Sequence, residues 1–192
     1  MPEIEVRPAT FEDISILANM DHSYNSEYVW QMDLQRTDSK SLTVTFREVR
    51  YPRPVRVEYP RSAQNLNLDW QERSGLLIAS IAEETQGDST GEQMGSLVGY
   101  ISLSLGHAPS ATWITDLAVR RRLRRQGIGS ALLLAAQEWA ANHECQHVVI
   151  EMQLKNHPAI KMAQKMGFDF YGFFDQYYKN GDIGLFFAKS LW

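Results

Sequence analysis

A run of arginines followed at once by two glycines constrains this chain more than any other feature. Residues 120–130 read RRRLRRQGIGS and place five arginines within six positions, directly after the apolar, strand-like segment 113–119. Downstream, apolar residues from Ile128 to Trp139 recur at the spacing of an amphipathic helix. The sequence therefore predicts a strand, a basic turn with two glycines, and a helix.

Two nucleotide-binding patterns do not fit this turn, and three other interpretations stay open. The P-loop pattern GxxxxGK[ST] is absent, and the dinucleotide pattern GxGxxG would need a glycine where Leu132 stands. The remaining interpretations are a nucleic-acid patch, a solvated basic turn that caps the helix, and a phosphate cradle. In the cradle, backbone N–H groups of residues 125–130 line the helix start, where Gly127 and Gly129 allow close approach and the arginines add charge.

Composition narrows the choice. A net charge of -4 over 192 residues argues against a general nucleic-acid binder. The single cysteine, Cys145, excludes an intrachain disulfide, and the histidines lack metal-ligand spacing. The N-terminus lacks the apolar core of a signal peptide, and no window offers about 18 uninterrupted apolar residues. We therefore expect a cytoplasmic protein without a membrane partner or a metal.

Hydrophobic patterns outline the remaining elements. Alternation predicts strands, which we place over residues 4–7, 42–49, 75–82, 94–105, 113–119, 146–152, 168–174 and 183–189. Helices are predicted after Thr10, where an acid three residues on resembles a capping box, after the glycines, and over 158–166.

The region 24–74 is harder to interpret from its pattern. Residues 55–59 are predicted to form an edge strand at best, because prolines stand nearby at Pro52, Pro54 and Pro60. Residues 62–69 favour a loop or a helix start, and residues 84–93 a polar turn. We expect a single domain over residues 1–192, with 24–74 as a specialised strand and loop region.

A second motif lies downstream of the glycines. The segment VIEM at 149–152 leads to Asn156-x-x-Ala159 and then to Lys165-Met166-Gly167-Phe168. Together with Arg124-x-x-Gly127-x-Gly129 after a strand, it resembles the paired acetyl-coenzyme A motifs of the GNAT superfamily of N-acetyltransferases. The resemblance covers residues 1–20 and 75–192.

A narrower resemblance covers the middle of the chain. Residues 41–60 and the pattern Gly172-x-x-x-x-x-Tyr178 are similar to streptothricin (nourseothricin) acetyltransferases. This resemblance implies an α/β (α+β) fold: a mixed, mostly antiparallel central sheet, with splayed parallel strands at 112–119 and 147–152 and helices on both faces.

The resemblance also implies an activity. It is the transfer of an acetyl group from acetyl-CoA, without a metal, to a primary amine of a small cationic molecule. The alternatives are a protein lysine or N-terminal acetyltransferase and, more remotely, a non-catalytic nucleic-acid binder. A homodimer is expected by analogy.

The resemblance assigns candidate coenzyme residues. The pantetheine arm would lie between the splayed strands against the backbone of Leu117 and Val119. Asn156 either holds a pantetheine amide or caps the following helix, or does both. Arg120, Arg121 and Arg122 are either solvated or reach the outer phosphate. The full coenzyme set is Leu117, Ala118, Val119, Arg124, Arg125, Gln126, Gly127, Ile128, Gly129, Ser130 and Asn156.

Acyl transfer to an amine also needs a proton acceptor, because a lysine-type amine is mostly protonated at pH 7. Glu151 interrupts an apolar strand and is the first candidate, and Asp116 is the second. Either acid is alternatively a substrate-binding or a structurally paired group. The tyrosine expected to protonate the thiolate is replaced by Ala163, so Tyr178 becomes the candidate donor, with Tyr177 and Tyr171 as rivals.

Overall fold

The computed structural model describes residues 3–38, 40–61, 70, 73–81, 96–106 and 108–192. The predictions for residues 62–69 and 84–93 lie outside these ranges. Among the described residues, no helix combines the length and the apolar character needed to cross a membrane.

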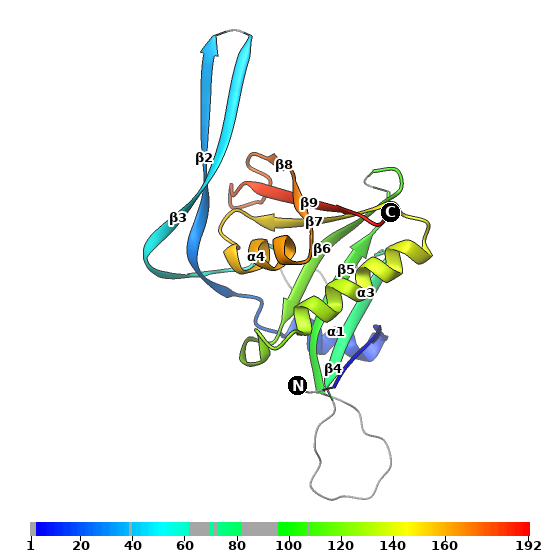
Figure 1. Ribbon diagram of the computed structural model, residues 1–192. Coiled ribbons are helices and arrows are strands. Elements are labelled where there is room, and N and C mark those ends of the chain that lie inside the picture. The colour runs from blue at the N-terminus through cyan, green and yellow to red at the C-terminus, as the bar shows by residue number, and fades with distance from the viewer. Residues whose placement is uncertain (1–2, 39, 62–69, 71–72, 82–95, 107) are drawn as a thin grey trace, which may run out of the picture.

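A seven-stranded sheet forms the centre of the described structure (Figure 1). Its strands pair antiparallel except for β6 and β7, the one parallel pair among the described strands. The order is β1 (Ile4–Pro8), β4 (Gly75–Ile81), β5 (Ser96–Ser104), β6 (Ala111–Val119), β7 (His147–Gln153), β9 (Gly184–Ser190) and β8 (Asp169–Phe174). The predicted mixed, mostly antiparallel sheet is confirmed.

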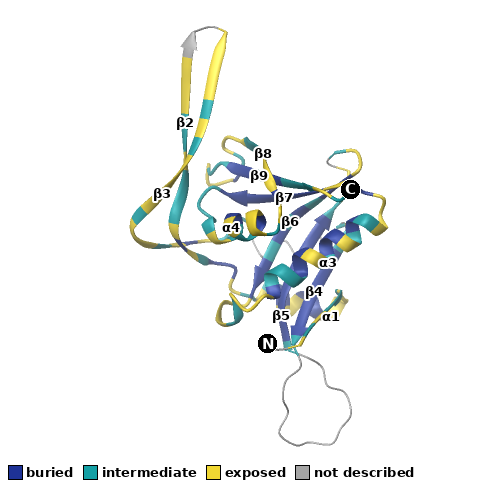
Figure 2. Cartoon of the chain, in the orientation of Figure 1, coloured by how far each residue is buried: buried dark blue, intermediate teal, exposed yellow. Residues whose placement is uncertain are grey.

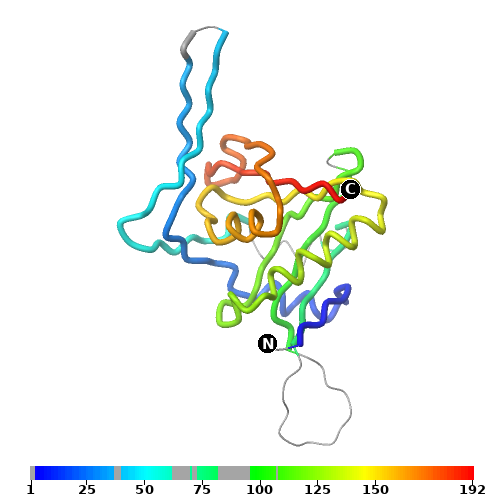
Figure 3. The backbone as a smooth tube through the Cα atoms, in the orientation of Figure 1, coloured from blue at the N-terminus to red at the C-terminus, as the bar shows by residue number. Residues whose placement is uncertain are grey.

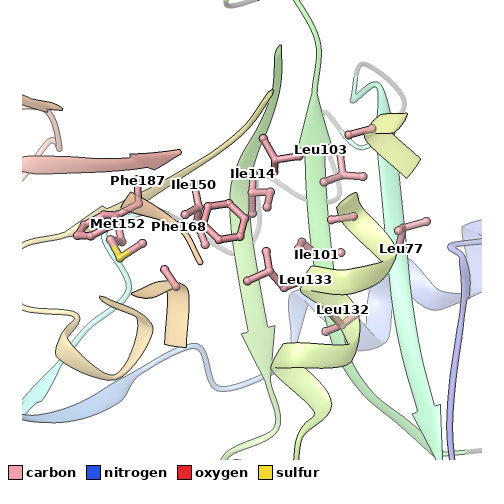
Figure 4. Packing of buried hydrophobic residues seen from close by; sticks show 14 of the residues in the cluster. Leu77, Ile101, Leu103, Ile114, Leu132, Leu133, Ile150, Met152, Phe168 and Phe187 are labelled. Carbon is pink, nitrogen blue, oxygen red and sulfur yellow. The ribbon is translucent and has the colours of Figure 1, made fainter. Parts of the chain in front are cut away.

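Helices cover both faces of this sheet, as predicted. α3 (Ile128–Asn142) and α4 (His157–Lys165) bury one cluster against it, in which Leu132 and Leu133 lie beside Ile101 and Ile114 (Figure 4). α1 (Phe11–Ala18) closes the other face with a second cluster. Figure 2 shows the central strands as the most buried part of the chain.

A long two-stranded hairpin projects from this body (Figure 3). It consists of β2 (Tyr24–Asp38) and β3 (Ser41–Val57). Trp30 and Phe46 anchor its middle part, because their rings contact Phe170 on β8. The hairpin is therefore held to the sheet by aromatic packing and by single polar contacts, such as the hydrogen bond from Trp30 N–H to the Leu154 carbonyl, rather than by strand pairing.

The sequence prediction was wrong about part of this hairpin. It placed a strand over 42–49 and at best an edge strand over 55–59, and it missed β2, whereas β3 continues from Ser41 through Pro52 and Pro54 to Val57. The pairing passes from Ser26↔Val55 directly to Tyr28↔Arg50. Pro52 and Pro54 therefore lie in a bulge, where a missing N–H removes no ladder hydrogen bond.

The predicted capping box at the start of α1 is present. The Thr10 backbone N–H donates to Asp13 Oδ2 over 2.7 Å, and the Arg7 guanidinium donates to both Asp13 oxygens over 2.8 and 3.0 Å. Burial pushes the pKa of the Asp13 carboxyl upward, but the hydrogen bonds from Arg7 and Thr10 outweigh it and hold this pKa below its usual range. Folding therefore favours the ionised form.

We expect Asp13→Asn to lower the free energy of unfolding by about 1 kcal/mol at pH 7. Because the folded-state pKa is depressed, the carboxylate contributes its stability above the unfolded pKa of about 3.9 and loses it as the pH falls through the folded value. The difference in the free energy of unfolding between variant and wild type, measured by urea titrations, should become smaller toward pH 3. Glu12→Gln, which changes an exposed acid in the same turn, is the control, and a gap that persists at pH 3 would contradict this account.

Candidate active site

The parallel strands β6 and β7 separate partway along their length. Their register runs from Ala111↔His147 to Ile114↔Ile150 and stops there. β6 continues to Val119 with its other edge paired to β5, and Figure 1 shows β6 and β7 diverging beyond this point. The edge of β6 from Thr115 onward therefore has backbone groups without a partner on β7, as the predicted splay requires.

The turn after β6 combines two unusual backbone conformations with the start of α3. Arg125 and Gly127 both have left-handed backbone conformations, with φ of 67° and 90°. Left-handed conformations of this kind occur in the backbone nests that bind anions, and residues 125–127 are called the nest below. The first intrahelical hydrogen bond of α3 runs from Ala131 N–H to Gly127 C=O. The N–H groups of residues 128–130 therefore stay available at the positive end of the helix.

Two arginines bind carbonyls along the open edge of β6. Arg61 donates to the Thr115 carbonyl over 2.7 Å, and Arg124 Nε donates to the Val119 carbonyl over 2.8 Å. Since alternate residues of a strand direct their backbone groups to the same edge, Leu117 lies between these two carbonyls on that edge. The backbone of Leu117 is thus the best placed for an extended ligand.

Arg124 proves to be a structural clamp. Besides the Val119 carbonyl, its guanidinium donates to the carbonyls of Ser23 over 2.7 Å and Asp21 over 3.2 Å. Burial lowers the pKa of this guanidinium. Its side chain therefore holds the turn in place, and any contribution to an anion site comes through the backbone of the turn.

Gly129, in the first turn of α3, packs closely against side chains of β6 and α4. A Cβ added at Gly129 would lie 3.1 Å from Met162 Sδ and 3.7 Å from Leu117 Cδ2. Gly129 thus faces the space between β6 and α4, and a side chain there would narrow it. Asn156 Oδ1 accepts a 3.3 Å hydrogen bond from Ala159 N–H, so the alternative that Asn156 caps α4 is confirmed.

Arg120, Arg121 and Arg122 lie on the outer side of the turn. They are exposed, and with Asp21 and the end of α1 they line an open groove of about 580 Å³. Within the described residues no ion pair involves these three arginines. Their charge therefore faces solvent beside the nest.

The two predicted acids lie on adjacent strands, and the same arginine joins them. Asp116 on β6 and Glu151 on β7 are both buried. The Arg61 guanidinium forms an ion pair with Glu151 and lies 3.7 Å from Asp116 Oδ1. Tyr177 donates a 2.6 Å hydrogen bond to Glu151 Oε2. The structure thus brings the acids together where β6 and β7 begin to diverge.

Asp116 has a second cationic partner. Arg73 donates to Asp116 Oδ2 over 2.6 Å and also to Ser102 Oγ. Burial raises the pKa of the Asp116 carboxyl to about 7, and the two guanidinium groups oppose that rise because they favour the charged form. An ionised Asp116 at neutral pH therefore depends on its arginines.

The three candidate tyrosines differ in their surroundings. Tyr178 is buried, with Arg61 Cζ 5.4 Å from its ring centroid, and burial raises the pKa of its hydroxyl. Tyr177 neighbours it, with ring centroids 5.0 Å apart. Tyr171 is 72% exposed on β8, and nothing in the structure places it with the acids.

Sequence reasoning missed Arg61 and Arg73. Both lie in or beside the region whose pattern was hardest to interpret, and no motif marks them. A further missed group is Tyr24 at the base of β2, whose hydroxyl donates to Gln153 Oε1 over 2.8 Å. Across the described ranges, no three His, Cys, Asp or Glu side chains are grouped so as to hold a metal ion.

Comparison with known proteins identifies the family. Residues 43–168 match the model of the acetyltransferase (GNAT) family. This match covers more than half of the chain, which therefore belongs to the GNAT family of acetyltransferases.

Individual relatives are more distant. The chain is 36% identical over 77 residues to the peptidyl-lysine N-acetyltransferase YiaC of Escherichia coli, a match over 40% of this chain and 46% of that protein. Matches to curated relatives span 46–61% of their lengths.

Solved structures share the whole fold. A nourseothricin acetyltransferase superposes with a TM-score of 0.76 at 22% identity, and a Bacillus anthracis protein assigned as a streptothricin acetyltransferase, solved with acetyl coenzyme A, with 0.73 at 19%. Each alignment covers 98% of both chains. At these identities the likeness shows the fold alone.

We expect Arg73→Met to lower the free energy of unfolding by about 3 kcal/mol, because it leaves the buried Asp116 with one cation at 3.7 Å. Adding Asp116→Asn should recover about half of this loss, since the double variant buries no unpaired charge. Guanidinium unfolding curves of Arg73→Met, Asp116→Asn, the double variant and the wild type give the comparison. If the losses in the free energy of unfolding of the two single variants simply add in the double variant, Arg73 stabilises the fold independently of Asp116.

Proposed function

We propose that this protein is an N-acetyltransferase that uses acetyl-CoA to acetylate a primary amine of a small cationic molecule, such as streptothricin or a related amine. One observation carries the proposal. The open edge of β6 begins beside two buried carboxylates and ends at a backbone nest. The edge and the nest suit an extended phosphorylated thioester, and the carboxylates suit an amine.

The coenzyme would lie along β6. The nest formed by Arg125, Gln126 and Gly127, with the N–H groups of Ile128, Gly129 and Ser130, would hold the pyrophosphate. The backbone of residues 117–119 would pair with the pantetheine arm as an added strand does, with Asn156 at the far side of the gap. Arg120, Arg121 and Arg122 would add positive potential beside the nest.

The acceptor would approach the carboxylates. When bound, acetyl-CoA supplies an acetyl thioester, whose C–S bond breaks as the amine nitrogen forms the new C–N bond. Glu151 accepts the proton that the amine loses, directly or through water. Tyr177 orients Glu151 through its 2.6 Å hydrogen bond. Tyr178 is protonated at neutral pH, as a tyrosine is at its ordinary pKa, and is the candidate donor to the departing sulfur; burial raises its pKa further and so makes it a weaker acid.

Gly127→Glu should abolish acetyl-CoA binding in isothermal titration calorimetry. The carboxylate would repel the pyrophosphate, and the left-handed backbone would be strained. Gly106→Glu is a matched control, because Gly106 has nearly the same φ, 88° against 90°, and open space around it. It carries the same strain at a site remote from the nest.

Two outcomes would contradict the coenzyme assignment. One is wild-type protein that binds no acetyl-CoA. The other is equal binding of acetyl-CoA by both glycine variants, which would show that the nest does not bind the coenzyme.

We expect Glu151→Gln to lower kcat by at least about 100-fold with no change in the affinity for acetyl-CoA, since the amide cannot accept the amine proton. Steady-state release of CoA measures the rate, and calorimetry measures the affinity. Asp169→Asn, which changes an exposed acid on β8, beyond β9 in the sheet, is the control. A rate within twofold of wild type would exclude Glu151 as the base.

The same assay compares Tyr178→Phe with Tyr171→Phe. A loss confined to Tyr178→Phe supports its role as the proton donor. Equal rates would mean that the thiolate departs without an acid.

A second candidate function is acetylation of a protein lysine. The observation in its favour is the partial match to YiaC, which acts on peptidyl lysine. Screening CoA release with streptothricin, polyamines and lysine or N-terminal peptides separates these acceptors. Salt-sensitive RNA or DNA binding that survives saturating CoA would instead favour the arginine run as a nucleic-acid site. A homodimer and a cytoplasmic location stay predictions.

A further inference from the structure

Arg61 contacts all three groups proposed to act on the acceptor. Its guanidinium pairs with Glu151, lies 3.7 Å from Asp116 Oδ1, and lies over the Tyr178 ring with Cζ 5.4 Å from the centroid. It also donates to the Thr115 carbonyl, the first backbone group beyond the last pairing of β6 with β7. An arginine side chain thus occupies the point where an acceptor amine has to arrive.

Among the described residues, the ion pairs of this cluster join two acids to two arginines. Two carboxylates, Asp116 and Glu151, face two guanidinium groups, Arg61 and Arg73. A cationic acceptor that entered beside Arg61 would meet carboxylates that are already paired with arginines, and a like charge. It gains the full attraction of the carboxylates only by replacing one of the arginines.

We propose that the Arg61 guanidinium holds the place of a cationic group of the acceptor, and that the acceptor binds by displacing it. The incoming ammonium or guanidinium group would pair with Asp116 and Glu151 and lie over the Tyr178 ring, which is a cation–π contact. The inference rests on the proposed function and names the chemistry that its acceptor must carry.

Arg61 is better suited to leave than Arg73. The Arg61 side chain is 30% exposed, whereas that of Arg73 is 15% exposed. Arg73 is also bound to Ser102 on β5, deeper in the sheet. Arg61 reaches the cluster from its solvent side and can move into water, where a guanidinium is well solvated.

Displacement also explains selection among amines. A neutral acceptor leaves Arg61 in place because it cannot compensate the two carboxylates. An acceptor with an alkylammonium or alkylguanidinium group reproduces the contacts of Arg61 and restores the charge balance. The site therefore favours cations.

The kinetic test is Arg61→Gln with a streptothricin or polyamine acceptor. Removing the competing guanidinium should lower the acceptor KM by about tenfold, with the KM for acetyl-CoA unchanged. A purely structural arginine would leave the acceptor KM unchanged or raise it. Arg56→Ala, which removes an exposed arginine of β3 whose ion pairs are with the exposed acids Asp21 and Glu58, is the control.

A conservative variant covers the case in which Arg61→Gln does not fold. Arg61→Lys keeps the charge but loses the planar fork, so it should hold the carboxylates less firmly. An acceptor KM below that of wild type supports the proposal, and an equal or higher KM overturns it.

A binding test separates this inference from acetyl transfer itself. Ethylguanidinium should raise the Tm of Arg61→Ala saturably at millimolar concentration, and should leave the wild type and Arg56→Ala unchanged. Ethylurea, a neutral analogue of similar shape, is the ligand control. No shift, or an equal shift in all three proteins, would overturn the cation site even if acetyl-CoA binds and turns over.

Discussion

The end of hydrogen bonding between β6 and β7 is the constraint on which the rest of the site depends. Up to Ile114 and Ile150 the two strands form one continuous sheet, and beyond them one edge of β6 is released. A released edge inside a buried sheet needs partners for its N–H and C=O groups. Arg61 and Arg124 satisfy two of the carbonyls, and a ligand shaped like a strand would satisfy others.

The buried charges follow from the same divergence. Side chains of Asp116 and Glu151 enter the opening from opposite strands, and their desolvation is offset by Arg61 and Arg73. Each pair is retained at a cost in stability that apolar residues would avoid. Buried charged groups at the opening of a sheet are candidates for a functional site, as proposed above for Asp116 and Glu151.

Much of the fold could be predicted from the sequence because its signals are local. Alternation marked the strands of the sheet, the capping box marked α1, and the arginine–glycine turn marked the start of α3. The hairpin could not be read in the same way, since β2 lies largely outside the core and the prolines of β3 fall in a bulge. Partners such as Arg61 and Arg73 are set by tertiary contacts, and no spacing in the sequence encodes them.

The clamp formed by Arg124 joins two parts of the molecule that the chain separates widely. It ties the turn after β6 to Asp21 and Ser23. The next residue, Tyr24, reaches Gln153 at the far end of β7. Two consecutive residues, Ser23 and Tyr24, thus connect the turn before α3 with the end of β7, so the backbone at the start of β2 fixes the position of both.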